Sequence, residues 1–147
     1  MHTVHHTKAV ILKSVPSGEY NKLVWLFTEA FGLVVATVTG VRKPGAKLQA
    51  QLIDYAFIDA DLVKGKDVWR LVSATLAHNP LADNLTHPFA RGYVRALATL
   101  ERFLIGEGDH PALFAHMQEI SAPFEGEGIS GKYYDTLAIW RSLVHLG

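Results

Sequence analysis

The hydrophobic and polar positions divide the chain near residue 80 into two parts with different periods. In the first part, short segments rich in Val, Ile, Thr and aromatic residues alternate with turn residues, as is typical of β-strands. The pattern predicts five strands, over residues 5–15, 22–29, 33–41, 52–63 and 68–76. After Pro80, apolar residues recur every three or four positions, which indicates helices. We therefore expect an α+β chain with a β unit followed by a small all-α unit.

The five strands are expected to form a closed or nearly closed barrel. A flat five-stranded sheet of this composition would leave an apolar face and two open edges with unpaired backbone groups. Residues 64–67 should close the last two strands as a hairpin. In the fourth segment the apolar positions change from odd to even near Phe57, which suggests a bulge or a barrel corner.

Three helices are predicted in the second part. The first should start near Thr86 or His87, and its apolar stripe is Phe89, Tyr93, Leu97, Leu100 and Leu104. The second should be capped by Asp109, and it offers to its core Leu113, Phe114, Met117 and Ile120. The third should be capped by Ser130, and its stripe is Tyr133, Leu137, Trp140 and Val144.

Composition narrows the class of protein. With 49% apolar and 19% charged residues, the chain has enough apolar material to form a core. It contains no cysteine, which excludes disulfides and thiolate zinc sites and fits a reducing cytosol. The sequence shows neither the apolar core of a secretory signal nor a run long enough to span a membrane. We expect a cytoplasmic protein with no membrane partner.

The sequence offers no recognisable catalytic or metal site. It contains no nucleophile elbow, no phosphate-binding loop and no dinucleotide fingerprint, so we expect neither an enzyme nor a small-molecule substrate. Its eight histidines are not spaced as metal ligands, and we expect no metal and no cofactor. Asp59 and Asp61 resemble a carboxylate pair, but the strand pattern puts them on the exposed side with no positioned partner.

Charge is unevenly distributed although the net charge is zero. Residues 1–80 carry nine Lys or Arg against six Asp or Glu, and residues 81–147 carry five against eight. The two parts are therefore +3 and −3, and a surface that binds polyanions is expected in the first part.

The loop over residues 40–47 concentrates this positive charge. Its cations are Arg42, Lys43 and Lys47, and its glycines let the backbone N–H groups approach phosphates. A solvated hairpin loop is the competing interpretation, and composition alone favours it. Tyr20 is expected to be the most exposed aromatic residue of the strands, and Lys22 lies beside it as a further candidate for nucleic-acid contact.

The segment from Gly18 to Leu48 resembles the N-terminal domain of the bacterial DNA recombination and repair protein family RecO. The resemblance lies in the Gly18-Glu19 pair before a strand, in a Leu-Phe-Thr near the end of that strand, in the Phe31-Gly32 turn, and in the run from Thr39 to Lys43. It is weaker over the helix from Phe89 to Leu104.

The resemblance implies an OB fold over residues 1–79, which would bind nucleic acid, and a helical domain over residues 80–147. RecO proteins bind single- and double-stranded DNA and anneal complementary strands. They work with RecR, and often RecF, to let RecA replace the single-strand binding protein SSB. By this resemblance DNA contact is assigned to Arg42, Lys43 and Lys47.

Two departures from the family matter. Many relatives carry a cysteine-bound zinc element in the helical part, and this chain has no cysteine. Relatives also usually continue well beyond the segment that resembles residues 134–147, so the sequence is either a naturally short homologue or a shortened form. We therefore assign no residues to the surface with which the family binds the SSB C-terminal tail.

Two other functions remain open from the sequence. A protein-interaction module of the same fold, without DNA binding, is compatible with the neutral net charge. A barrel directed at RNA is a third and weaker alternative, which the basic loop also fits.

Overall fold

The computed structural model describes residues 2–82, 88–104, 106–108, 110–121 and 144. Contacts between residues divide the chain into two compact units. The first consists of Met1–Asn79 with Gly106–Asp109, and the second of Pro80–Ile105 with His110–Gly147. A short segment from the helical part of the sequence thus belongs to the first unit.

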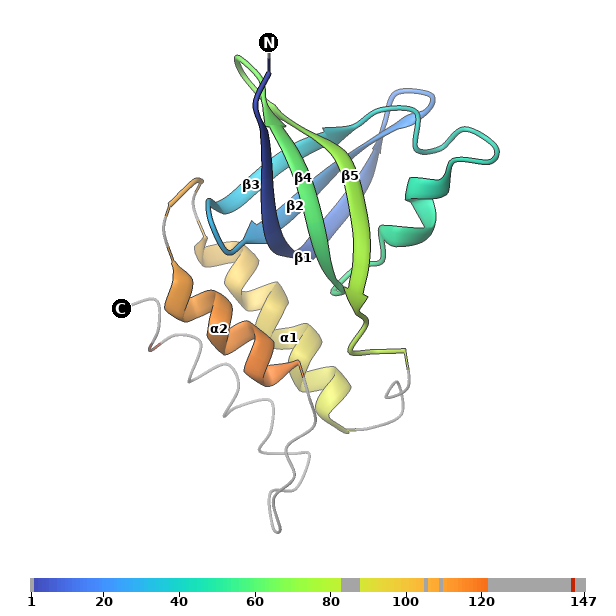
Figure 1. Ribbon diagram of the computed structural model, residues 1–147. Coiled ribbons are helices and arrows are strands. Elements are labelled where there is room, and N and C mark those ends of the chain that lie inside the picture. The colour runs from blue at the N-terminus through green and yellow to red at the C-terminus, as the bar shows by residue number, and fades with distance from the viewer. Residues whose placement is uncertain (1, 83–87, 105, 109, 122–143, 145–147) are drawn as a thin grey trace. The chain divides into compact units, whose positions relative to one another are not determined.

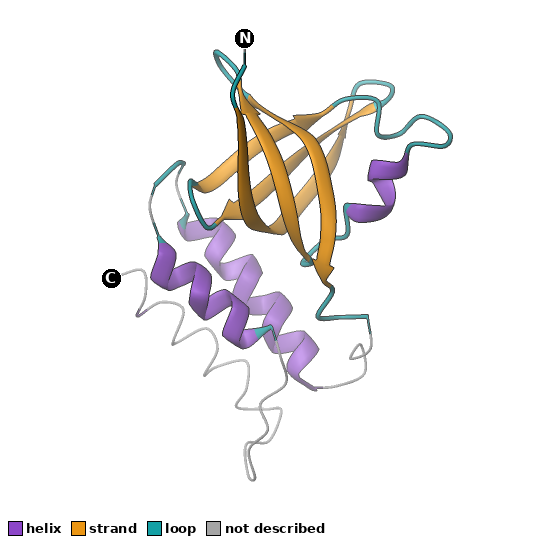
Figure 2. Cartoon of the chain, viewed as in Figure 1, coloured by secondary structure: helices purple, strands orange, loops and turns teal. Residues whose placement is uncertain are grey.

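The first unit is a closed barrel of five strands (Figures 1 and 2). They are β1 (Val4–Ser17), β2 (Asn21–Thr28), β3 (Gly32–Val38), β4 (Phe57–Lys64) and β5 (Trp69–His78). Around the barrel they follow the order β1-β2-β3-β5-β4, and β1 pairs with both β2 and β4. All neighbours are antiparallel except β3 and β5, which run parallel. This five-stranded arrangement is that of an OB fold.

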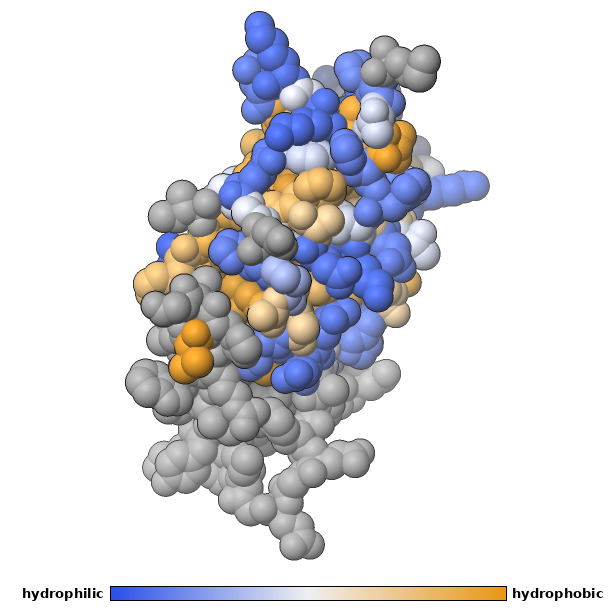
Figure 3. All heavy atoms as spheres, turned by 60° about the vertical axis from the view of Figure 1, so that its left-hand side comes forward, coloured by the Kyte–Doolittle hydropathy of each residue, from blue (hydrophilic) through white to orange (hydrophobic). Residues whose placement is uncertain are grey.

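Alternating apolar residues of every strand fill the barrel. The core includes Ala9 and Ile11 from β1, Val24 and Leu26 from β2, Val34 and Ala36 from β3, Ile58, Ala60 and Leu62 from β4, and Trp69 and Leu71 from β5. Because side chains alternate between the two faces of a strand, the residues between them point out of the barrel. On the face of the molecule in Figure 3, hydrophilic residues predominate and apolar ones appear in smaller patches.

All five predicted strands exist, and most of their ends agree with the prediction within two residues, but the end of β3 and the start of β4 were predicted wrongly. β3 stops at Val38 and not at residue 41, because the chain turns there and Gly40 takes a φ of +67°. β4 begins at Phe57 and not at residue 52. The bulge suggested near Phe57 corresponds to a shift of register against β5 between Phe57 and Ile58.

The segment before β4 follows a path that alternation could not reveal. Residues Lys47–Gln51 form a short 3-10 helix, η1. Tyr55 has a φ of +68°, which breaks the extended backbone. Its N–H donates to the carbonyl oxygen of Ile11 at 2.7 Å, and the N–H of Ile11 donates to the carbonyl oxygen of Ala56 at 3.0 Å. These bonds to β1 fix the entry into β4.

The second unit contains two described helices, α1 (Pro88–Phe103) and α2 (Pro111–Ile120). The predicted stripe of α1 is buried at Tyr93, Leu97, Leu100 and Leu104. The predicted core positions of α2 are buried as well, at Leu113, Phe114, Met117 and Ile120.

The predicted cap of α2 was wrong, because the N-cap position is His110, whose side chain makes no capping hydrogen bond. Asp109, the predicted cap, and the predicted third helix, apart from Val144, lie outside the described residues. Neither helix has the length and apolar character needed to cross a membrane, as far as the described residues go.

The expectation for Asp61 also needs correction. Its carboxylate does have a positioned partner, the Nδ1 atom of His6. The pairing of β1 with β4 places these two residues directly opposite each other, and it places Lys8 opposite Asp59. Cross-strand pairing was not visible in the sequence of either strand alone.

Candidate nucleic-acid interface

The basic loop after β3 is fastened to the turn between β1 and β2. The N–H of Gly40 donates to Asn21 Oδ1 at 2.8 Å. The N–H of Arg42 donates to the carbonyl oxygen of Tyr20 at 2.8 Å, and its Nη1 donates to that of Gly18 at 3.0 Å. Three hydrogen bonds therefore hold the loop in one position relative to the turn.

This fastening brings Arg42, Lys43 and Tyr20 together. Lys43 Nζ lies 5.5 Å from the centre of the Tyr20 ring, a cation–π contact. Tyr20 is 40% exposed, so its ring is accessible to a base. The guanidinium of Arg42 carries five N–H donors, and the bond to Gly18 uses one of its nitrogens. The cluster therefore presents an aromatic face beside two cations.

The other two predicted site residues lie in different surroundings. Lys47 is exposed at the start of η1 and borders a hollow of about 390 Å³ shared with Leu48, Gln51 and β5. Lys22 is half-buried in β2, opposite Val38 at the end of β3. The hydrogen bonds and the cation–π contact thus unite three of the five predicted residues, and Lys47 and Lys22 lie outside that cluster.

The outer face of β1, β2 and β3 carries a second group of residues suited to nucleic acid. Trp25 lies opposite Lys13 of β1 and Val35 of β3. Lys13 Nζ lies 4.9 Å from the centre of the Trp25 ring, which is half-buried. OB folds bind oligonucleotides on the face of their second and third strands. Sequence reasoning did not single out Lys13 or Trp25. Alternation with the core residues Val24 and Leu26 could have placed Trp25 on this face, whereas Lys13 reaches it only through the register shift after Ile11.

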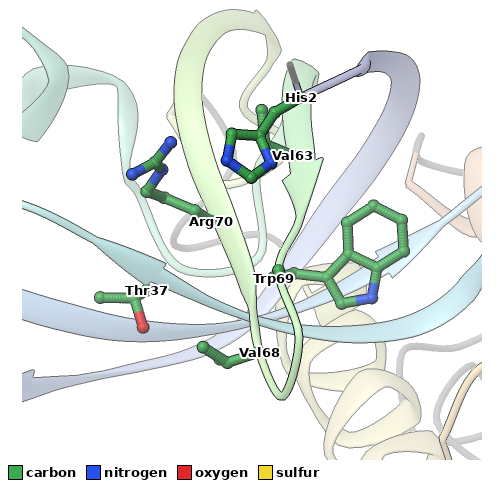
Figure 4. A pocket seen from close by; sticks show the side chains of 7 residues that line it. His2, Thr37, Val63, Val68, Trp69 and Arg70 are labelled. Atoms are coloured by element: carbon green, nitrogen blue, oxygen red, sulfur yellow. The ribbon is translucent and has the colours of Figure 1, made fainter.

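On the same face, a second row of cross-strand neighbours runs from β1 through β2 and β3 to β5. Leu23 lies opposite Val15 and Thr37, and Thr37 lies beside Arg70 of β5. Thr37 and Arg70 line a hollow of about 310 Å³ with His2, Val63 and Val68. Figure 4 shows that Arg70 and Trp69 extend to opposite sides of β5. Arg70 therefore adds a cation to the outer face, whereas Trp69 turns toward the barrel interior.

The clearest electrostatic effect in the first unit is at Glu107. A hydrogen bond from Trp69 and then a hydrogen bond from Lys64 lower the pKa of this carboxyl below its ordinary value. Both interactions favour the charged form. Within the described residues, no group of three or more potential metal ligands comes together.

Comparison with known proteins identifies the family. The family described as "Recombination protein O N terminal" matches residues 1–80, which is more than half of the 147 residues. The chain belongs to the RecO family. Among similar RecO proteins are the DNA repair protein RecO of Synechococcus elongatus and that of a Synechococcus sp. strain, each 28% identical to this chain over 150 residues.

The match to RecO includes every part of the barrel. Residues 1–80 contain all five strands and the basic loop, so the candidate interface lies inside the region that matches the family. The alignments to the two Synechococcus proteins cover 100% of this chain and 56% of each relative. The chain thus spans about half the length of these RecO proteins. Its family is one of DNA recombination and repair.

Proposed function

We propose that the chain is a recombination mediator that binds single- and double-stranded DNA through its barrel and anneals complementary strands. In the same proposal it helps RecA to load on SSB-coated DNA in the RecFOR pathway. The observation that carries the proposal is the cluster of Arg42, Lys43 and Tyr20, held together by the hydrogen bonds between the basic loop and the β1–β2 turn. Membership of the RecO family supports it.

The chemistry of the cluster suits the backbone of a nucleic acid. A guanidinium binds a phosphate through two parallel hydrogen bonds, and an ammonium acts as a mobile point charge. An exposed aromatic ring stacks on a base of any sequence. Strands held by their phosphates keep their base edges free to pair, so annealing needs no catalytic residue and no cofactor.

The protein partners belong to the same proposal. RecR, RecF and the SSB C-terminal tail are the partners that the family resemblance implies. We propose that the helical unit meets them, because the basic loop and Tyr20, the residues proposed to bind DNA, are on the barrel. Direct binding of each purified partner to the full chain would test this part.

Titration with a single-stranded oligonucleotide at several salt concentrations tests DNA binding. Affinity should fall with salt, with a log–log slope of about −0.7 for each phosphate neutralised. The triple variant R42E/K43E/K47E should lose most of the affinity. Arg42→Glu alone is matched by Lys8→Glu, which makes the same change in net charge on β1, and only the first should weaken binding.

Competition between DNA and RNA of one sequence tests the preference for DNA, and strand annealing with and without SSB tests the mediator function.

A protein-interaction module without DNA binding is the second candidate. The zero net charge of the chain favours it, as does the use of Arg42 and Lys43 in contacts within the barrel unit. If the affinity for the oligonucleotide does not depend on salt, or does not change in R42E/K43E/K47E, the result would support this candidate over DNA binding.

A further inference from the structure

Residues 106–108 lie between α1 and α2 in the sequence but pack against the barrel. They belong to the same compact unit as the strands. Glu107 forms a β-bridge with Gly32, and the N–H of Gly108 donates to the carbonyl oxygen of Phe31 at 3.0 Å. The segment is thus added to the turn between β2 and β3 like a short strand.

The carboxylate of Glu107 is bound by two donors from the β4–β5 hairpin. Trp69 Nε1 donates to its Oε1 at 2.8 Å, and Lys64 Nζ donates to its Oε2 at 3.0 Å. Lys64 Nζ also lies 5.3 Å from the centre of the Trp69 ring. The indole in turn contacts the rings of His5 and Phe31, which fixes the direction of its N–H. Lys64 and Trp69 therefore form a preorganised site for an oxyanion.

The close approach of the segment depends on Gly32. This residue has a φ of +69°, and a Cβ atom there would lie 2.6 Å from the carbonyl oxygen of Gly108. Backbone atoms cannot move aside as a flexible side chain can. Only glycine at position 32 allows residues 106–108 to pack against the barrel in this position.

We propose that Lys64 and Trp69 form a second phosphate site of the barrel, which the carboxylate of Glu107 occupies until a nucleic acid displaces it. The proposal rests on the proposed DNA binding and deepens it. A phosphate oxygen can accept the same two hydrogen bonds as the carboxylate. The side chains of Lys64 and Glu107 are 57% and 45% exposed, so a phosphate can reach Lys64 from solvent. Trp69 is buried and its N–H is bound to Glu107, so the N–H becomes available only when the carboxylate leaves. Water and salt weaken such an exposed ion pair, which makes exchange feasible.

The surroundings of the site favour a polyanion over a single anion. Lys66 and Arg70 lie on the same hairpin and are exposed. Arg70 lies beside Thr37, in the row of outer-face residues that runs across β2 and β3. Because Arg70 and Trp69 extend to opposite sides of β5, a strand bound along this row would reach the Lys64–Trp69 site by passing over the hairpin tip, where Lys66 lies. Displacement of Glu107 would then release the connection between α1 and α2 from the barrel, which couples nucleic-acid binding to the helical unit.

Glu107→Gln in the full chain tests the proposal. The amide keeps an acceptor for Trp69 but loses the charge that holds Lys64. Its affinity for an oligothymidylate should rise roughly two- to fivefold at low salt. The salt slope should become steeper by about 0.7, because one more phosphate is bound. Glu29→Gln is the control, since it makes the same change in net charge on the barrel without a contact to Lys64.

Two further measurements tie the effect to the site. The double variant K64Q/E107Q should bind no tighter than Lys64→Gln alone, because the gain requires the ammonium. In the unchanged chain, the oligonucleotide should speed hydrogen exchange of the Gly108 amide, which shows release of the segment without any substitution.

The outcomes separate this proposal from DNA binding itself. If the unchanged chain binds with a salt-dependent affinity but Glu107→Gln gains no more than Glu29→Gln, only the second site is refuted. Exchange of the Gly108 amide that does not respond to the oligonucleotide also refutes it. If neither the unchanged chain nor Glu107→Gln binds, both proposals fail together.

Discussion

Arg42 donates a hydrogen bond from Nη1 to the carbonyl oxygen of Gly18 at 3.0 Å, across a separation of 24 residues in the sequence. The backbone N–H of the same residue donates to the carbonyl oxygen of Tyr20. One residue thus positions the basic loop on the β1–β2 turn with its backbone and its side chain. A charge held in this way loses less conformational entropy when it meets a phosphate than one on a mobile loop does.

Two substitutions of Arg42 separate its charge from its geometry. Arg42→Lys keeps the charge, so the salt dependence of oligonucleotide binding should stay the same while the affinity falls, because bidentate contact is lost. Arg42→Gln should also make the log–log salt slope shallower by about 0.7. Binding measured by fluorescence anisotropy over a range of salt distinguishes the two. Equal slopes for Gln and for the unchanged chain would mean that Arg42 meets no phosphate.

Stacking at Tyr20 should depend on the ring and not on its hydroxyl. Tyr20→Phe should bind an oligothymidylate with nearly unchanged affinity, because the aromatic face and the contact with Lys43 remain. Tyr20→Leu should lose about 1–3 kcal/mol of binding free energy, which is the usual contribution of stacking on one base. Titration of both variants at one salt concentration is sufficient. Similar losses for Phe and Leu would argue against stacking.

Gly32→Ala should destabilise the barrel unit more than alanine at another glycine of positive φ. Both Gly32 and Gly45 have such a φ, and alanine there costs about 1–2 kcal/mol of conformational strain. At Gly45 a Cβ atom would meet nothing within 4 Å, whereas at Gly32 it would collide with Gly108. Urea unfolding should therefore rank Gly32→Ala below Gly45→Ala in stability. The reverse order would show that residues 106–108 do not pack closely on Gly32.

The stability difference between the unchanged chain and Glu107→Gln should depend on pH. The hydrogen bonds from Trp69 and Lys64 lower the pKa of Glu107 in the folded protein below its ordinary value of 4.5. The stabilisation by the carboxylate is then complete above the pKa of the unfolded chain and is lost as the pH falls through the folded pKa. Urea unfolding of both proteins at neutral and acidic pH should show the difference shrinking as acid is added. A difference that is independent of pH would exclude a role for the charge.

Local patterns in the sequence determined most of the elements. Segments rich in β-branched and aromatic residues, separated by turn residues, predicted five strands, because such side chains favour the extended backbone of a sheet. The stripe from Tyr93 to Leu104 predicted the buried face of α1 for the corresponding reason in a helix. The ends of β3 and β4 escaped prediction, since a φ of +67° at Gly40 and of +68° at Tyr55 leaves no mark on the hydrophobic pattern.

By itself the sequence determined that the chain has a β part and a helical part, and that its positive charge is concentrated in one loop. Only the tertiary structure decided which residues meet. It placed Arg42 and Lys43 beside Tyr20, set Lys47 against β5, and brought Glu107 to Trp69 across 38 residues and to Lys64 across 43. Contacts of this kind depend on the register and closure of the barrel, which fix distances between segments that are far apart in the chain.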